Sequence, residues 1–214
     1  MRVALDAMGS DDAPRAELAG VELALNEIRD LEVTLVGKQE IVENTRGRYG
    51  HRVELVPAPE VVGMHEPPNE AIKLKRLSSI AVCMDLQQQG KVDAVVSAGN
   101  TGAVMAFAVT RLGVFPGVHR PALAVLFPRV KGSALVVDVG ANVDTKPQQL
   151  LQFAMMGATA ASFFFRKANP SIGLLNIGKE ETKGNEVTVA AHRLFRQSGI
   201  NFVGNCEGND ILTG

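Results

Sequence analysis

Short apolar runs alternate with longer amphipathic patterns along most of the chain. Runs rich in valine, leucine and isoleucine are typical of buried strands, at 2–8, 31–37, 52–56, 92–98, 122–127, 134–140, 171–178 and 200–204. Apolar residues at helical spacing predict helices between them, from Pro14 onward, over about 69–89, 101–113 and 147–167, and around 187–195. This alternation predicts a layered α/β fold, in which a mainly parallel sheet with flanking helices forms a single domain over 1–214.

Two local signals refine this prediction. The runs 122–127 and 134–140 are joined by only a short link, 128–133, whereas a parallel crossover needs about a dozen residues or more. This link predicts an antiparallel hairpin and therefore a mixed sheet. Asp11 and Asp12 precede Pro14, a pattern that predicts the N-cap and first turn of a helix.

Composition and charge exclude several classes of protein. Hydrophobic residues make up 46% of the 214 positions, enough to bury a substantial core. The 22 basic and 23 acidic residues nearly cancel, so no overall positive charge favours nucleic acid as a partner. Cys83 and Cys206 are the two cysteines, a number that fits a reducing cytosol without a disulfide framework. The uncharged stretch 150–165 is shorter than the roughly 20 residues that span a bilayer, and predicts a buried helix or a subunit interface.

Polar, glycine-rich loops recur where a predicted strand leads into a predicted helix. They are the segments 9–14, 97–103, 138–147 and 176–186. In open α/β sheets ligands bind at the carboxyl ends of strands, and helix N-termini offer free N–H groups to anions. Glycine lets the backbone approach a ligand closely, while asparagine and threonine add side-chain donors. A group with several acceptor oxygens, such as phosphate, would fit these loops.

Each loop taken alone has an ordinary alternative explanation. Asn and Asp also cap helices, and none of the loops has the spacing of a Walker A or dinucleotide-binding motif. Asp138, Asn142 and Asp144 could ligate a metal, although capping of the next helix is the favoured alternative. Lys183 lies at a helix start, where it could be solvated or could hold an anion. Cys83 falls within an apolar helical pattern and is expected in the core, and no Ser–His–Asp or Cys–His arrangement suggests itself.

Lys73, Lys75 and Arg76 form a basic group near the end of a predicted helix. A solvated basic face is the simpler explanation for three cations so close together. The functional alternative is a docking surface for an acidic partner, since complementary charge speeds and orients association.

The motifs taken together resemble one protein family, the PlsX family of bacterial phosphate acyltransferases of phospholipid synthesis. The matching stretches run through almost the whole chain in order: 3–14, 71–79, 93–103, 120–124, 138–144, 174–186 and 204–211. The most specific of them are "SAGNTGA" at 97–103 and the "NIG…E..KG" pattern that begins at 176. Ser10 stands where the family usually has glycine, and Lys179 stands where it usually has an acidic residue.

The resemblance implies a fold, an activity and partners. The fold would be similar to that of isocitrate and isopropylmalate dehydrogenases and of phosphotransacetylases. The activity would move a fatty acyl group from acyl carrier protein to inorganic phosphate, and the acyl phosphate would supply a membrane acyltransferase. Family members are cytoplasmic homodimers that associate peripherally with membranes and use no metal or organic cofactor. They also continue beyond the motifs seen here, so we expect this chain to lack their C-terminal part.

Site residues follow from matching the family motifs to this chain. We expect phosphate to bind at Ser97, Gly99, Asn100, Thr101 and Gly102. The catalytic candidates are Lys183, which matches the loop lysine of the family, and Asn100. Further candidates for the substrate site are Asp6, Asn142 and Asp144. For contact with the carrier protein or with anionic lipid, we expect Lys73, Lys75 and Arg76.

Two other functions remain open on the sequence alone. A metal- and NAD-dependent dehydrogenase on the related fold could use Asp138 and Asp144 for magnesium, but no segment suits a nicotinamide pocket. A non-catalytic module that binds phosphate or the carrier protein is the second alternative. Turnover of an acyl carrier protein thioester would distinguish both from the acyltransferase.

Overall fold

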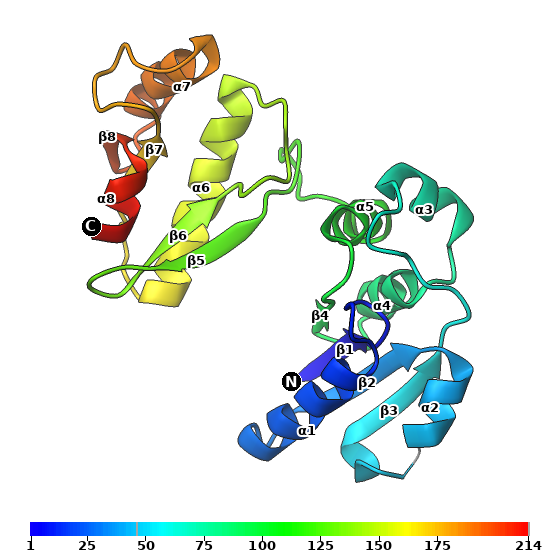
Figure 1. The fold of residues 1–214 in the computed structure, drawn as a ribbon. Coiled ribbons are helices and arrows are strands. Elements are labelled where there is room, and N and C mark those ends of the chain that lie inside the picture. The colour runs from blue at the N-terminus through cyan, green and yellow to red at the C-terminus, as the bar shows by residue number, and fades with distance from the viewer. Residues whose placement is uncertain (46, 214) are drawn as a thin grey trace. The chain divides into compact units, whose positions relative to one another are not determined.

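The computed structural model describes residues 1–45 and 47–213 and divides the chain into two compact units, Met1–Val114 and Phe115–Gly214 (Figure 1). Each unit contains its own strands and helices and its own buried core. The single domain over 1–214 therefore stays a prediction, and the units are described one at a time.

The first unit is built on a parallel four-stranded sheet. Its strand order is β3-β2-β1-β4, with β1 at Arg2–Asp6, β2 at Glu32–Gly37, β3 at Val53–Pro57 and β4 at Ala94–Val96. The chain first moves outward from β1 to β3 and then returns to place β4 on the other side of β1. This reversal creates a topological switch point between β1 and β4, the position where open α/β sheets bind ligands.

Helices cover both faces of this sheet. They are α1 at Arg15–Glu27, α2 at Gln39–Thr45, α3 at Pro68–Leu74, α4 at Ser79–Gln88 and α5 at Thr101–Leu112, with a 3-10 turn at Gly50–Arg52. Val3 and Leu5 of β1 pack with Val21 of α1, while Ala4 packs with Cys83 of α4. Alternate residues of β1 thus face opposite layers, as strand geometry requires. The α/β prediction and the parallel sheet are confirmed in this unit.

The single helix predicted over 69–89 is wrong, because the chain breaks it between α3 and α4. The Oγ atom of Ser78 accepts a hydrogen bond from the Ala81 N–H and caps α4 at its new start. Glu60, which belongs to neither helix, stabilises the segment between them. Its carboxylate accepts the Leu77 N–H at 2.8 Å and its carbonyl accepts the Ser79 N–H at 3.1 Å. The apolar pattern continues across both helices and therefore does not indicate the interruption.

The predicted cap of the first helix is also wrong. α1 begins at Arg15, and Pro14 occupies its N-cap position without a side-chain hydrogen bond. Asp12 instead forms an ion pair with Arg15 at 2.6 Å. The buried carboxylate of Glu17 accepts the Ser10 N–H at 3.0 Å, so it is Glu17 that holds this loop.

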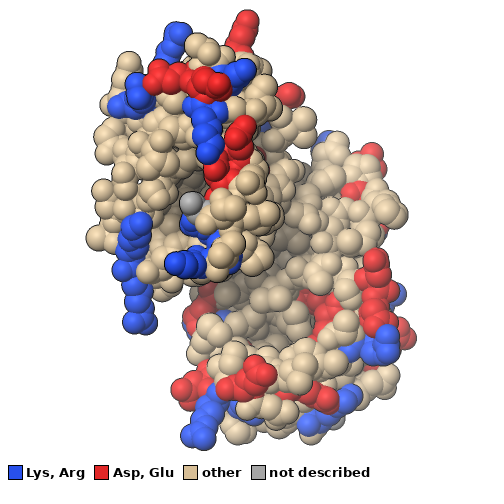
Figure 2. All heavy atoms as spheres, turned by 60° about the vertical axis from the view of Figure 1, so that its left-hand side comes forward, with Lys and Arg blue, Asp and Glu red and all other residues tan. Residues whose placement is uncertain are grey.

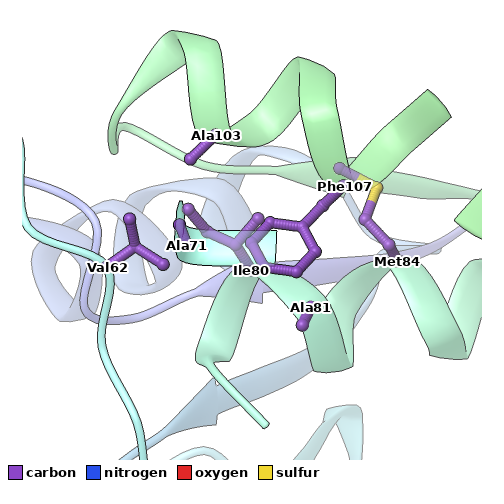
Figure 3. Close-up of a cluster of buried hydrophobic side chains, with 7 residues drawn as sticks. All are labelled: Val62, Ala71, Ile80, Ala81, Met84, Ala103 and Phe107. Carbon is purple, nitrogen blue, oxygen red and sulfur yellow. The ribbon is translucent and has the colours of Figure 1, made fainter. Parts of the chain in front are cut away.

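An apolar cluster between α3, α4 and α5 forms one part of the core of the first unit (Figure 3). Its members are Val62, Ala71, Ile80, Ala81, Met84, Ala103 and Phe107. Phe107 is the largest, is 1% exposed and lies beside Ile80 at the centre of the view. Cys83 belongs to the neighbouring cluster, where burial and then the charge of Asp6 raise the pKa of its thiol well above the usual value. The prediction that Cys83 is a core residue is confirmed.

In its described residues, the second unit contains two small sheets and three helices. Strands β5 at Ala124–Pro128 and β6 at Ser133–Val137 form the antiparallel hairpin that the short link predicts. Strands β7 at Ile172–Leu175 and β8 at Phe202–Cys206 pair in parallel. In the described residues the hairpin forms a sheet of its own and does not join the parallel strands. The helices are α6 at Pro147–Phe165, α7 at Glu186–Gln197 and α8 at Gly208–Thr213.

α6 is the long helix that the sequence predicts around 147–167. It packs against β6 so closely that a Cβ atom on Gly157 would lie 2.9 Å from Val137 Cγ2. Phe153 and Ala161 are buried, whereas Phe163 near the helix end is 82% exposed. Neither α6 nor any other helix in the described residues is long and apolar enough to cross a bilayer.

Replacing Phe107 by alanine should destabilise the first unit. The ring is fully surrounded in the cluster of Figure 3, so its loss should leave a cavity and lower the free energy of unfolding by about 3–5 kcal/mol. Urea unfolding followed by fluorescence of Tyr49, the single tyrosine of the chain, measures this unit. Leu23→Ala, at a position that is 64% exposed, is the matched control and should change the free energy by no more than about 0.5 kcal/mol. Equal effects of the two changes would contradict the assignment of Phe107 to the core.

Candidate functional site

Two loops meet at the switch point of the first unit, one after β1 and one after β4. Gly9 and Gly99 bring their backbones together: a Cβ atom on Gly9 would lie 2.7 Å from the Gly99 nitrogen, and one on Gly99 would lie 3.2 Å from Gly9 Cα. Contacts under 3.0 Å do not occur for real Cβ atoms, so a side chain on Gly9 would push the loops apart. Gly9 and Gly99 therefore allow the backbones of the two loops to approach each other closely.

Asp6 and Ser97 join the same two loops by hydrogen bonds. Asp6 is fully buried, and its carboxylate accepts the Ser97 hydroxyl at 2.7 Å and the Met8 N–H at 3.0 Å. Ser97 Oγ in turn accepts the Gly99 N–H at 3.1 Å. The hydroxyl hydrogen of Ser97 is thus used within the protein, and the buried Asp6 carboxylate is satisfied from both sides. Direct contact of either side chain with phosphate stays a prediction.

Asn100 has its whole side chain engaged. The Oδ1 atom accepts the Ala103 N–H at 3.1 Å and so caps α5. The Nδ2 group donates to the carbonyls of Gly63, Met64 and Glu66 at 2.9–3.2 Å. These bonds hold the segment 58–67 between β3 and α3, the proline-rich loop, against the helix start. The side chain of Asn100 therefore holds the site in shape. In this arrangement it has no free hydrogen-bond donor for a catalytic role, which stays a prediction.

Thr101 and Gly102 provide the open part of the site. Both are exposed in the first turn of α5. Among the described residues, no hydrogen-bond partner is found for either backbone N–H. The turn is held from outside by α3, because a Cβ atom on Gly102 would lie 2.6 Å from Pro68 Cγ. A fixed helix start with free N–H groups is suited to binding an anion.

In the second unit, Asp138 organises the loop that follows β6. Its carboxylate accepts the N–H groups of Ala141 and Asn142 at 3.2 Å, and the Asn142 side chain donates to it at 3.2 Å and to the Pro121 carbonyl at 3.0 Å. Asp144 is exposed on the same loop. The alternative that these side chains cap α6 is wrong, since the N-cap is Lys146, whose N–H donates to Gln149 at 2.8 Å.

The loop after β7 carries Lys183. Asn176 holds this loop, since its Nδ2 group donates to the Lys183 carbonyl at 2.9 Å and its Oδ1 atom accepts the Ile177 N–H at 2.9 Å. The Lys183 stem lies over Gly178, where an added Cβ atom would come within 3.0 Å of Lys183 Cγ. Gly184 follows with a φ of 97°, a conformation that favours glycine. The loop therefore has a defined shape around this lysine.

The two lysines of this loop differ in their surroundings. Lys179 forms an ion pair with Asp210 at 2.9 Å, and the hydrogen bond and charge of that carboxylate raise the pKa of the lysine. Lys183 is exposed and has no ion-pair partner in the part of the chain that the structure describes. Of the two cations, Lys183 is therefore the one free to meet an anionic ligand.

The three basic residues at the end of α3 separate into two kinds. Lys75 is turned inward, because its ammonium group donates to the Val61 carbonyl at 2.6 Å and pairs with Glu66. The hydrogen bond from Lys75 to the Glu66 carboxylate, together with one from the Gly63 N–H, lowers the pKa of the Glu66 carboxyl. No pattern in the sequence indicates this pairing. Lys75 thus supports the proline-rich loop.

Lys73 and Arg76 are exposed and line a hollow of about 230 Å³. Arg111 of α5 also lines it, and its guanidinium reaches Asp85 at 3.4 Å and the Arg76 carbonyl at 3.3 Å. The sequence prediction missed Arg111, although a single cation within the apolar pattern of α5 could have drawn attention to it. Three cations thus share one surface of the first unit.

The structure brings together only part of the predicted site. Within the first unit, neighbouring loops contain Asp6, Ser97, Gly99, Asn100, Thr101 and Gly102. Within the second unit, Asn142 and Asp144 share one loop, and Lys183 lies on another. Assembly of the two groups into one pocket remains a prediction.

Comparisons with known proteins agree with the motifs. A family model described as fatty acid synthesis protein matches residues 1–214. A phosphate acyltransferase from Nostoc punctiforme is 47% identical across the whole of this chain, which covers 64% of that protein. One from Pelotomaculum thermopropionicum is 48% identical, and the chain covers 63% of it. The chain thus spans a little under two thirds of the length of these curated relatives.

A solved structure supports the fold independently. The EutD phosphotransacetylase from Staphylococcus aureus superposes with a TM-score of 0.67 at 16% identity, over 97% of this chain and 68% of that one. The predicted similarity to the phosphotransacetylase fold is confirmed. From the family model and the relatives that share close to half of its residues, we conclude that the chain belongs to the fatty acid synthesis protein family, in which its curated relatives are named phosphate acyltransferases.

Proposed function

We propose that this chain transfers a fatty acyl group from the thioester of acyl carrier protein to inorganic phosphate, giving an acyl phosphate for phospholipid synthesis. The family and the names of its relatives support this activity over a dehydrogenase. The structural observation that carries it is the first turn of α5, where the Thr101 and Gly102 N–H groups are open at the switch point of a parallel sheet.

The reaction needs no covalent intermediate on the protein. A phosphate oxygen attacks the thioester carbonyl carbon, the tetrahedral intermediate collapses, and the carbon–sulfur bond breaks to release the carrier thiolate. A thiol has a pKa of about 8.5, so the leaving group does not require a strong general acid. The protein must position the phosphate, stabilise the oxyanion and exclude water. The site also offers no thiol nucleophile among its described residues. The nearby Cys83 is buried, and this burial raises the pKa of its thiol well above the usual value.

Within this proposal, phosphate binds the backbone N–H groups of Thr101 and Gly102, with the Thr101 hydroxyl as a further donor. Asp6, Ser97, Gly99 and Asn100 hold these groups in place through the hydrogen bonds and close contacts described above. The backbone can thus supply fixed donors without a reorganisation of the loop. Asn142 and Asp144 are further candidates for the substrate site.

Lys183 supplies the positive charge that the α5 turn lacks. Its ammonium group either aligns the phosphate dianion or stabilises the oxyanion of the tetrahedral intermediate. The free state of this lysine supports the assignment, since a paired lysine such as Lys179 would first have to break its ion pair.

Partners and location follow from the same proposal. Lys73 and Arg76, together with Arg111, would contact the acidic carrier protein or anionic lipid, whereas Lys75 would act through the fold of its loop. Figure 2 shows Lys and Arg interspersed with Asp and Glu on the face drawn, so attraction would be local. The chain would act as a cytoplasmic homodimer at the membrane periphery, near the acyltransferase that consumes the acyl phosphate.

One assay tests the proposed activity. The 214-residue chain is incubated with an acyl carrier protein thioester and phosphate, and hydroxylamine traps acyl phosphate as the hydroxamate. We expect hydroxamate that depends on both protein and phosphate, and a reaction without phosphate corrects for direct aminolysis of the thioester. Binding of the carrier protein without turnover would instead support a non-catalytic module, and would contradict the transferase.

Lys183→Ala should lower the rate of acyl phosphate formation by about 100- to 1000-fold, the usual cost of losing one oxyanion or phosphate donor. The matched control is Lys179→Ala in the same loop, which removes an exposed ion pair and should leave the rate nearly unchanged. The hydroxamate assay measures both variants, with circular dichroism to confirm that they are folded. Near-normal activity of Lys183→Ala would remove this residue from the site.

Ser97→Ala should weaken the site through its loops. The change leaves the Oδ2 atom of the buried Asp6 carboxylate and the Gly99 N–H each without a partner, although Asp6 Oδ1 keeps the Met8 N–H, at a cost of about 1–3 kcal/mol in the stability of the first unit. We expect a higher KM for phosphate and an earlier urea transition of Tyr49 fluorescence. The control is Thr159→Ala, which removes a hydroxyl bonded only to its own helix and should change neither quantity.

A further inference from the structure

We infer that His192 and Asn205 are positioning residues that fix the loop carrying Lys183. The two side chains form a buried bridge from α7 through β8 to the Glu180 carbonyl, which we name the His192–Asn205 bridge. The hydrogen bonds of the bridge do not depend on the proposed function. Its consequence for catalysis rests on the proposed role of Lys183.

The hydrogen bonds of the bridge have only one consistent direction. Asn205 Nδ2 lies 2.8 Å from the Glu180 carbonyl oxygen, which can only accept, so the amide group must donate there. The Asn205 Oδ1 atom then faces His192 Nδ1 at 2.9 Å and must accept from it. His192 Nδ1 therefore carries a hydrogen, and the imidazole sets the orientation of the Asn205 amide.

The bridge ends on the turn that presents Lys183. The Glu180 carbonyl accepts not only Asn205 but also the backbone N–H of Lys183, at 3.0 Å. One carbonyl oxygen thus joins the buried amide to the backbone of the lysine. If Asn205 releases this carbonyl, the turn from Glu180 to Lys183 loses its only bond to β8 in the described residues.

Packing makes the bridge rigid. His192 is 3% exposed and Asn205 is 9% exposed. The His192 ring meets the Phe202 ring edge-on, with 5.0 Å between the centroids, which restrains its rotation. The Nε2 atom has no hydrogen-bond partner among the described residues and lies 3.8 Å from the Glu181 carboxylate, so a second loop residue also faces the imidazole.

A surface contact on the same helix gives a matched comparison. Arg196, one turn beyond His192 on α7, pairs with Glu181 at 2.7 Å, and both side chains are more than half exposed. Exposed ion pairs contribute little, whereas a buried amide that loses its partner is costly. The loop should therefore depend on the bridge and not on the Arg196 pair.

The test uses Asn205→Asp and His192→Leu in the full 214-residue chain. The first keeps an acceptor for His192 but removes the donor to Glu180, and the second removes the donor that orients Asn205. We expect hydrogen exchange of the Lys183 amide, the one N–H within 181–184 that has a hydrogen bond in the described residues, to accelerate about tenfold in both variants, while exchange in α6 is unchanged. Arg196→Ala is the control and should leave exchange as it is. His192→Asn, whose amide can replace the Nδ1–H donor, should restore slow exchange.

The same variants are assayed for acyl phosphate formation. A displaced Lys183 should lower kcat with little change in KM for the carrier protein, and His192→Asn should recover kcat. Unchanged exchange of the Lys183 amide in folded Asn205→Asp protein would overturn the bridge itself. Faster exchange with normal kcat would overturn its role in positioning Lys183. If the unaltered chain forms no acyl phosphate, the proposed function fails, and the exchange data still decide whether the bridge holds the loop.

Discussion

The contact between two loop backbones at the switch point is the constraint on which the rest of the first unit's site depends. Gly9 and Gly99 can approach only because neither has a side chain, and the buried Asp6 carboxylate joins both loops through Ser97. With the loops fixed, Asn100 can cap α5 and hold the proline-rich loop at the same time. Contacts made several residues away thus fix the position of the open N–H groups at the start of α5.

The periodic parts of the fold could be predicted from the sequence. Alternation of apolar runs gave the strands and most helices, and the short link at 128–133 gave the hairpin. The break between α3 and α4 could not be predicted, because Glu60 makes it from a distant segment while the apolar pattern continues. The separate sheet of the hairpin likewise depends on which strands pair, which local patterns do not specify.

The candidate site was predicted at the level of loops but not of side chains. The motifs identified the loops after β4 and β7, yet Asn100 and Ser97, expected to meet phosphate, use their hydrogens within the protein. Lys75, expected at the surface, pairs inward with Glu66. Spacing shows that a polar residue lies in a loop, whereas its partner lies elsewhere in the chain and appears only in three dimensions. Arg111 and Asn205 went unnoticed for the same reason, and the sequence presents His192 as a scattered histidine without a partner.

The open first turn of α5 has a consequence for how such a site can be studied. Its donors are peptide N–H groups, which every residue except proline possesses, so side-chain truncation leaves them in place. Alanine scanning would register the supports, Ser97 and Asn100, as if they were the phosphate contacts and would pass over the proposed contacts themselves. A backbone ester at Thr101 or Gly102, which deletes one N–H while keeping the side chain, is the chemical change that addresses the proposed binding atoms directly.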